Sequence, residues 1–213
     1  MPDTPRHLPA SPVVRRRPAA PRGAFECVVI GASAGGVEVL GQILPAVPAT
    51  FGAALLIVMH LPPASPSFLV GALGSRCALP VSEPDAGEPI RGGHVYIAPP
   101  DYHMLVDSDA TVALSIEPPV RFSRPSIDVL MESAAAVYGP RLLGVLLSGA
   151  NDDGARGLAA IRAAGGTTWA QTPATAVASE MPAAAIVLGA VDEALSPATL
   201  AARLAAWPKL LTG

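Results

Sequence analysis

The 213-residue sequence contains few cysteine, lysine and aromatic residues. Its two cysteines, Cys27 and Cys77, lie far apart in the chain and lack the close spacing of metal-ligand pairs. Two such isolated cysteines favour reduced, partly buried thiols over a disulfide or a metal site. We therefore expect a cytoplasmic protein.

Charged residues are also scarce. They make up 15% of the sequence, and the formal net charge is −3. A chain with so weak a field is expected to bind neither nucleic acid nor an anionic membrane surface. Every apolar run is interrupted by proline, glycine or a charge before it reaches the roughly 18 residues that a membrane-spanning helix needs. We therefore expect no membrane insertion.

Residues 1–24 differ from the rest of the chain. Proline recurs there, three arginines stand together at 15–17, and no apolar periodicity surrounds them. This composition predicts a disordered tail, and the missing apolar stretch after the arginines argues against a secretory signal. Residues 25–208 are expected to form one domain, because the sequence is 51% hydrophobic and long enough to bury one sizeable core.

Strand-like and helix-like patterns alternate throughout this domain. Strands are predicted at 28–30, 53–59, 79–83, 94–98, 104–106, 112–116, 142–147, 167–171 and 191–194, and helices at 37–44, 67–73, 127–138, 154–164, 182–188 and 198–206. Such alternation is typical of an α/β fold. We expect a doubly wound, mostly parallel sheet with helices on both faces, and an antiparallel hairpin made by 104–106 and 112–116.

The most informative stretch is the Gly-x-Ser-x-Gly-Gly turn at residues 31–36. It follows the β-branched run Val28–Ile30 and precedes a helical pattern, which predicts a strand, a sharp turn and a helix. Ser33 lies at the apex and is presented to solvent. The free N–H groups of the following helix suit an anion, which can be a phosphate or the oxyanion of acyl transfer. The turn alone does not choose between them.

Two further strands end on residues that could serve such a serine. His60 ends the second strand, and Asp152-Asp153 follow the strand at 142–147. Ligands of parallel sheets gather at these carboxyl ends. A nucleophilic serine needs a base, and an imidazole base needs an acceptor on its other nitrogen.

Each candidate also has a plain structural interpretation. Ser33 suits a corner or a phosphate loop, His60 an inert strand end, and the two aspartates an ordinary helix N-cap. The convergence of the three positions favours a Ser-His-Asp site. His94 and His103 are weaker candidates, because neither ends an obvious central strand.

From Cys27 to about Trp207 the chain resembles the catalytic domain of the chemotaxis protein-glutamate methylesterase/glutaminases, the CheB family. The resemblance rests on separated motifs in the right order, namely VIGASAGG at 29–36, HLPP at 60–63, GHVYIAP at 93–99, RPSIDVL at 124–130, LSG at 147–149, DGA at 153–155, AQ at 170–171 and MP at 181–182. By this resemblance the family's catalytic serine, histidine and aspartate fall on Ser33, His60 and Asp153.

The resemblance implies a serine carboxylester hydrolase. Such an enzyme removes the methyl ester from glutamate side chains of chemoreceptors, through a Ser-His-Asp triad and an acyl-enzyme, and deamidates certain glutamines. The implied partners are the cytoplasmic helices of methyl-accepting chemoreceptors or a related signalling protein. The implied protein is a monomer and needs no metal or cofactor.

Two departures from the family pattern stand out. The family commonly has Gly-Met-Gly where this chain has Gly149-Ala150-Asn151. Relatives also usually carry a receiver domain upstream, for which residues 1–24 are too short, so we expect a free-standing catalytic domain. The altered corner leaves open a second interpretation, a regulatory or docking module that keeps the fold without turnover.

A dinucleotide-binding oxidoreductase is the competing class of enzyme, because Gly-Ala-Ser-x-Gly also opens such folds. It fits poorly. The dinucleotide fingerprint requires glycine where Ser33 stands, and the single lysine, Lys209, leaves no Tyr-x-x-x-Lys pair.

Overall fold

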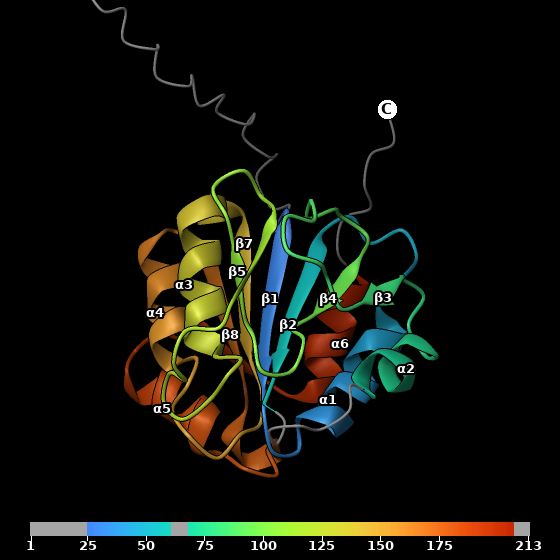
Figure 1. Ribbon diagram of the computed structural model, residues 1–213. Coiled ribbons are helices and arrows are strands. Elements are labelled where there is room, and N and C mark those ends of the chain that lie inside the picture. Colours follow the sequence, from blue (N-terminus) through green and yellow to red (C-terminus); the bar gives the residue numbers. More distant parts are fainter. Residues whose placement is uncertain (1–24, 61–67, 207–213) are drawn as a thin grey trace, which may run out of the picture.

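The fold is built around β1 (Cys27–Ala32), the middle strand of a seven-stranded sheet (Figure 1). The computed structural model describes residues 25–60 and 68–206. The predicted tail at 1–24 lies outside the described residues, as does the first position of the helix predicted at 67–73. Within the described ranges, no helix is both long and apolar enough to cross a membrane.

The sheet has the strand order β3-β4-β2-β1-β7-β8-β9, and each of its pairings is parallel. The other strands of this sheet are β2 (Ala54–Met59), β3 (Val81–Ser82), β4 (Val95–Ile97), β7 (Leu142–Leu146), β8 (Thr167–Gln171) and β9 (Glu193–Leu195). The predicted hairpin is confirmed as β5 (His103–Val106) and β6 (Val112–Ser115), which form a separate antiparallel sheet.

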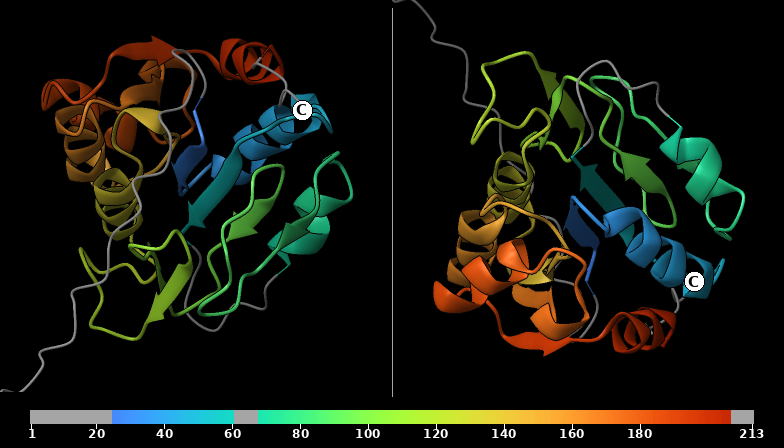
Figure 2. Two further views of the ribbon diagram at one scale, coloured as in Figure 1. Left: turned by 90° about the horizontal axis from the view of Figure 1, so that it is seen from above. Right: turned by 90° about the horizontal axis from the view of Figure 1, so that it is seen from below.

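Helices cover both faces of the large sheet, as the alternating pattern predicts (Figures 1 and 2). The helices are α1 (Gly36–Ile43), α2 (Leu69–Gly74), α3 (Ile127–Tyr138), α4 (Ala155–Ala163), α5 (Glu180–Val187) and α6 (Pro197–Ala205). Short 3-10 turns occur at Leu44–Ala46, Gly139–Arg141 and Pro173–Thr175. Helix α5 begins at Glu180, earlier than predicted, because Pro182 is tolerated in a first helical turn.

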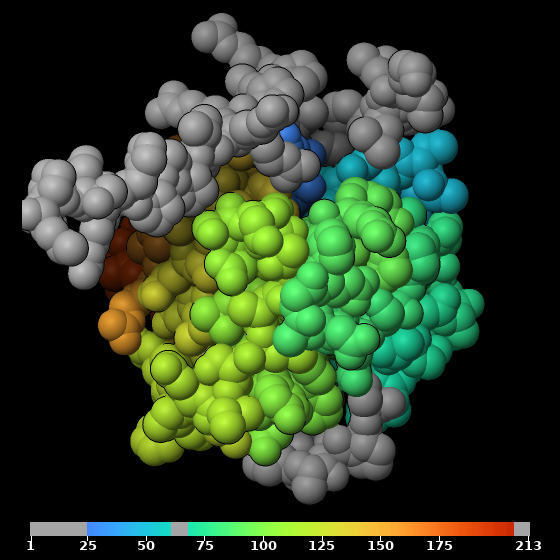
Figure 3. Space-filling model, turned by 45° about the horizontal axis from the view of Figure 1, so that its top comes forward, coloured from blue at the N-terminus to red at the C-terminus, as the bar shows by residue number. Residues whose placement is uncertain are grey.

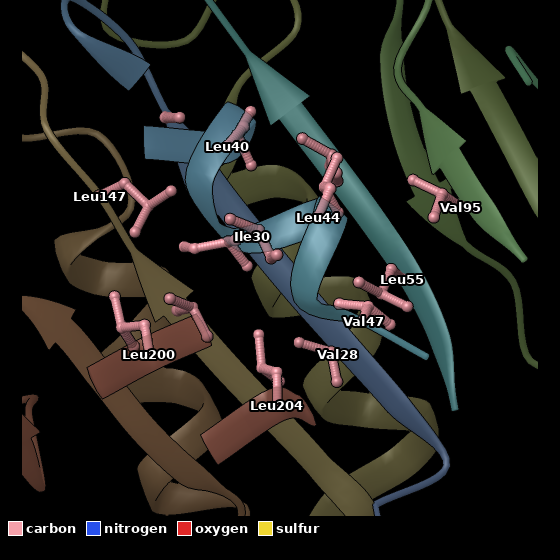
Figure 4. Packing of buried hydrophobic residues seen from close by; sticks show 14 of the residues in the cluster. Val28, Ile30, Leu40, Leu44, Val47, Leu55, Val95, Leu147, Leu200 and Leu204 are labelled. Atoms are coloured by element: carbon pink, nitrogen blue, oxygen red, sulfur yellow. The ribbon is translucent and has the colours of Figure 1, made fainter. Parts of the chain in front are cut away.

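Alternate residues of β1 point into two separate cores. Val28 and Ile30 pack with α1 and α6, as Figure 4 shows around Leu40 and Leu200. Cys27 and Val29 pack on the other face with α3, α4 and α5. All four β1 side chains are fully buried, which is why this strand reads as one continuous apolar run. Cys27 is a free thiol, as predicted, and burial raises its pKa.

The direction of winding changes between β1 and β7. The chain first runs from β1 to β2, then to β3 and β4 on the same side, and later returns to β7 on the other side. In a sheet of this kind, the crevice at the carboxyl ends of the strands beside such a switch is where ligands bind. Ser33 lies at the carboxyl end of β1, beside this switch.

Candidate active site

Ser33 lies between the ends of two neighbouring strands. The register pairs Ala32 with Met59 and Gly31 with Leu146. One residue further, the His60 N–H donates to the Ala32 carbonyl at 3.0 Å, and the Ser33 N–H donates to the Ser148 carbonyl at 2.9 Å. The sheet therefore brings Ser33, His60 and Ser148 to one level at its carboxyl edge.

The turn that carries Ser33 is the predicted corner between β1 and α1. Gly35 has a φ of +77° and directly precedes the helix, a left-handed conformation that favours glycine. A Cβ at this position would also lie 2.5 Å from the Cβ of Val177. Ser33 itself is partly exposed, as expected for a presented side chain.

His60 and Asp153 are joined by a direct contact. The distance from His60 Nε2 to Asp153 Oδ2 is 2.9 Å, and the Asp153 side chain is fully buried. The structure therefore joins two of the three predicted site residues in one hydrogen-bonded contact, and the sheet register puts the third beside His60.

Asp153 is held by the N-terminus of α3. The Ser126 hydroxyl donates to Oδ1 at 2.9 Å, the Asp128 N–H donates to Oδ1 at 3.0 Å, and the Ile127 N–H donates to Oδ2 at 2.7 Å. With His60, four donors surround this carboxylate. The positive end of the helix dipole adds to their effect.

These donors govern the ionisation of Asp153. Burial is the largest single influence and disfavours the charged form, but the hydrogen bonds from His60, Asp128 and Ile127 together outweigh it. The pKa of Asp153 is therefore held below its ordinary value. At neutral pH the side chain is a carboxylate, which can only accept a hydrogen bond.

The helix-capping interpretation of Asp152 and Asp153 is wrong. Gly154, in a left-handed conformation, precedes α4, and no side chain at that position caps the helix. The N-terminus of α4 instead donates to Asp128 Oδ1, from Gly154 N–H at 2.9 Å and Gly157 N–H at 2.7 Å. Burial raises the pKa of Asp128.

Asp152 faces outward and forms an ion pair with Arg121. Its side chain is 57% exposed, whereas that of Asp153 is 0% exposed. Arg121 also reaches Asp128, with 3.4 Å between Nε and Oδ2. The two adjacent aspartates therefore differ completely in environment.

Two residues of this site, Ser126 and Ser148, were not singled out from the sequence. Ser126 is fully buried at the N-cap of α3, and the Pro-Ser sequence at the start of a helix was a usable signal for it. Ser148 Oγ lies 2.6 Å from the Ala34 carbonyl and accepts the Ala178 N–H at 2.9 Å. It thereby ties the serine turn to the loop before α5.

Asn151, the departure noted in the sequence, supports Asp153. Its Oδ1 accepts the Asp153 N–H at 3.0 Å. The side chain therefore braces the backbone of the buried aspartate and forms a local Asx-type turn.

The two weaker histidine candidates occupy different places in the fold. His94 directly precedes β4 and so lies at the amino edge of the sheet, with its Nε2 2.8 Å from Ser82 Oγ. His103 is buried on β5. Among the described residues, no group of three or more His, Cys, Asp and Glu side chains is placed to hold a metal ion.

Comparisons with known proteins identify a family of similar sequences. The family model described as CheB methylesterase matches residues 28–204. A relative from Leptospira interrogans is 45% identical over 172 residues, which cover 81% of this chain and 89% of that protein. The protein-glutamate methylesterase/protein-glutamine glutaminase of Symbiobacterium thermophilum is 45% identical over 168 residues, which cover 79% of this chain and 46% of that protein.

A solved structure agrees with the fold. The crystal structure of the Thermotoga maritima CheB methylesterase catalytic domain superimposes with a TM-score of 0.81 at 32% identity, covering 85% of this chain and 98% of that one. The family match spans β1 through α6, and the parallel sheet with its separate hairpin is the architecture of that domain. The chain therefore belongs to the CheB methylesterase family.

Proposed function

We propose that this chain is a protein-glutamate methylesterase. It hydrolyses the methyl ester of glutamate side chains on chemoreceptors and deamidates certain glutamines there. Family membership and the names of the relatives support this class of reaction. The observation that carries it is the 2.9 Å contact between His60 and the buried Asp153, beside Ser33 at the edge of the sheet.

The contact supports a different role for each ring nitrogen of His60. Asp153 is ionised and accepts only, so His60 Nε2 carries the proton that lies between them. The Nδ1 atom of the neutral ring then has a free lone pair. In the proposed mechanism Nδ1 takes the proton of the Ser33 hydroxyl as its Oγ attacks the ester carbonyl carbon.

The tetrahedral intermediate then collapses. The bond from carbon to the methoxy oxygen breaks, and His60 Nδ1–H gives its proton to the leaving group, which departs as methanol. The product of this step is an ester between Ser33 and the glutamyl group. With a glutamine substrate, the same step releases ammonia.

Water completes the cycle. It attacks the acyl-enzyme while His60 Nδ1 takes its proton, and that proton returns to Ser33 as the free glutamate leaves. Asp153 stays ionised throughout and stabilises the imidazolium that forms twice in each cycle. N–H groups at the N-terminus of α1 have no acceptor inside the helix and suit the oxyanion of both intermediates.

A fluorophosphonate probe tests the proposal. We expect covalent labelling of Ser33, located by mass spectrometry, and methanol release from methylated receptor fragments. A His60→Ala variant should lose both, because the serine is then without its base. An unlabelled Ser33 together with no methanol release would instead favour the regulatory or docking module.

A further inference from the structure

His103 is a buried histidine that this mechanism does not use. It lies on β5, is only 2% exposed, and sits inside the hairpin segment whose outer surface Figure 3 shows in yellow-green. Its Nδ1 accepts the Ser126 N–H at 3.1 Å, and its Nε2 lies 3.2 Å from the Pro118 carbonyl.

These two partners fix the protonation of the ring. A backbone N–H can only donate, so Nδ1 must carry a lone pair; a carbonyl can only accept, so Nε2 must carry the proton. His103 is therefore neutral and held in one tautomer. It serves as a hydrogen-bond acceptor for the residue that begins α3.

The residue that it holds is the one that contacts Asp153. Ser126 has extended backbone angles, φ −107° and ψ 138°, and its hydroxyl donates to Asp153 Oδ1 at 2.9 Å. A hydrogen-bonded chain thus runs from His103 through Ser126 and Asp153 to His60. Among these residues, only His60 is not fully or almost fully buried.

We propose that His103 is a positioning residue for Asp153 and acts through Ser126. Its Nδ1 keeps Ser126 in the conformation that aims the hydroxyl, and the two N–H groups after it, at the carboxylate. A second bond fastens the other end of β5 to the same helix, since the Val106 N–H donates to Ser133 Oγ at 3.1 Å. The hairpin thereby fixes the position and direction of the N-terminus of α3.

The effect on turnover rests on the function proposed above. A displacement of about 1 Å in a catalytic group can lower a rate on the order of 100-fold. His103→Leu removes the acceptor and introduces an apolar side chain of similar bulk. His103→Asn keeps an acceptor oxygen close to the Nδ1 position.

We expect His103→Leu to lower kcat by about 10- to 100-fold with KM within about twofold. His103→Asn should restore kcat to within about threefold of wild type, since it returns the acceptor. His94→Leu is the matched control, because it removes a histidine at the opposite edge of the sheet and should leave kcat unchanged. Equal losses in the Leu and Asn variants would overturn the inference, because restoring the acceptor at the Nδ1 position would then have no effect.

A second measurement does not depend on activity. In nitrogen-15 histidine spectra, the Nε2-bound proton of His60 reports the contact with Asp153. It should shift or broaden in His103→Leu and keep its wild-type position in His103→Asn. An unchanged signal in both variants, with wild-type kcat, would refute the role of His103 and leave the proposed function intact. If the wild type is inactive, but the His60 signal still changes in His103→Leu and not in His103→Asn, only the proposed function is refuted.

Should His103→Leu fail to fold, Ser126 tests the same chain. Ser126→Ala removes the hydroxyl that contacts Asp153, and Ser126→Thr retains it. We expect the Ala variant to show the low kcat and the altered His60 signal, and the Thr variant to resemble wild type. Identical behaviour of these two variants would overturn the inference.

Discussion

Asp128 and Asp153 each accept hydrogen bonds from the N-terminus of the helix associated with the other. Asp153, just before α4, binds the N–H groups of Ile127 and Asp128 at the start of α3. Asp128, in the first turn of α3, binds the N–H groups of Gly154 and Gly157 at the start of α4. This exchange joins the two helices at the level of the site, so two helices and not a loop alone fix the position of Asp153.

Ser33→Ala should abolish methanol release, and His60→Ala should come close to doing so. Loss of a nucleophile or its base in such a triad lowers turnover by on the order of 10⁴-fold or more. Initial rates on a methylated receptor fragment provide the measurement, with thermal melting to show that each variant is folded. Near-wild-type turnover in Ser33→Ala would exclude the serine mechanism.

The adjacent aspartates should behave very differently. Asp153→Asn places an amide among four hydrogen-bond donors and favours the wrong tautomer of His60, so turnover should fall by roughly 10⁴-fold. Asp152→Asn alters an exposed ion pair and should lower turnover by less than about tenfold. The same kinetic assay compares both variants. The opposite ranking would show that Asp152, not Asp153, orients the histidine.

Asp153 should make the protein sensitive to acid. Its pKa in the folded protein lies below the ordinary value of 3.8, so the folded state binds this proton less readily than the unfolded state. The resulting stability is present above pH 3.8 and is lost as the pH falls through the lower folded-state pKa. Asp128, whose pKa is raised, contributes in the opposite direction.

Urea unfolding at neutral pH and below pH 3.8 measures this effect. We expect the free energy of unfolding to decrease less on acidification in Asp153→Asn than in wild type. Asp107→Asn, at an exposed position on the hairpin turn, is the control and should follow wild type. An identical pH dependence in wild type and Asp153→Asn would contradict the assignment.

Asp128→Ala should destabilise the fold. It leaves the N–H groups of Gly154 and Gly157 without their acceptor, and an unsatisfied buried donor costs about 1–3 kcal/mol. Glu132→Ala, at an exposed position of α3, should change the free energy of unfolding by less than about 0.5 kcal/mol. Equal stability of the two variants would show that the hydrogen bonds from Gly154 and Gly157 to Asp128 contribute little to stability.

Much of this fold could be predicted because local patterns were clear. Continuous apolar runs mark β1, β2 and β7 as buried strands, and the glycine turn fixes the corner at Ser33. The partners of Asp153 could not be predicted, because an aspartate before Gly154 looks the same whether it caps its own helix or a distant one. Only the family resemblance selected Asp153 over Asp152.

His103 shows a second limit. Its value to the site comes from Ser126, 23 positions along the chain, and from a helix that itself contacts Asp153. Position relative to a central strand was a poor guide, because β5 belongs to the separate two-stranded sheet. The roles of Ser33, His60 and Asp153, the state of residues 1–24, and the free-standing nature of the domain stay predictions.

The parallel register of β1, β2 and β7 has a consequence for the nascent protein. Ser33, His60 and Asp153 follow three different strands, and Asp153 leaves the ribosome 120 residues after Ser33. A slip of one residue between β1 and β2 would move His60 by about 3.3 Å and turn it to the other face. Hydrolytic competence would therefore arise late and all at once, and incomplete or misregistered chains would be inert toward the esters around them.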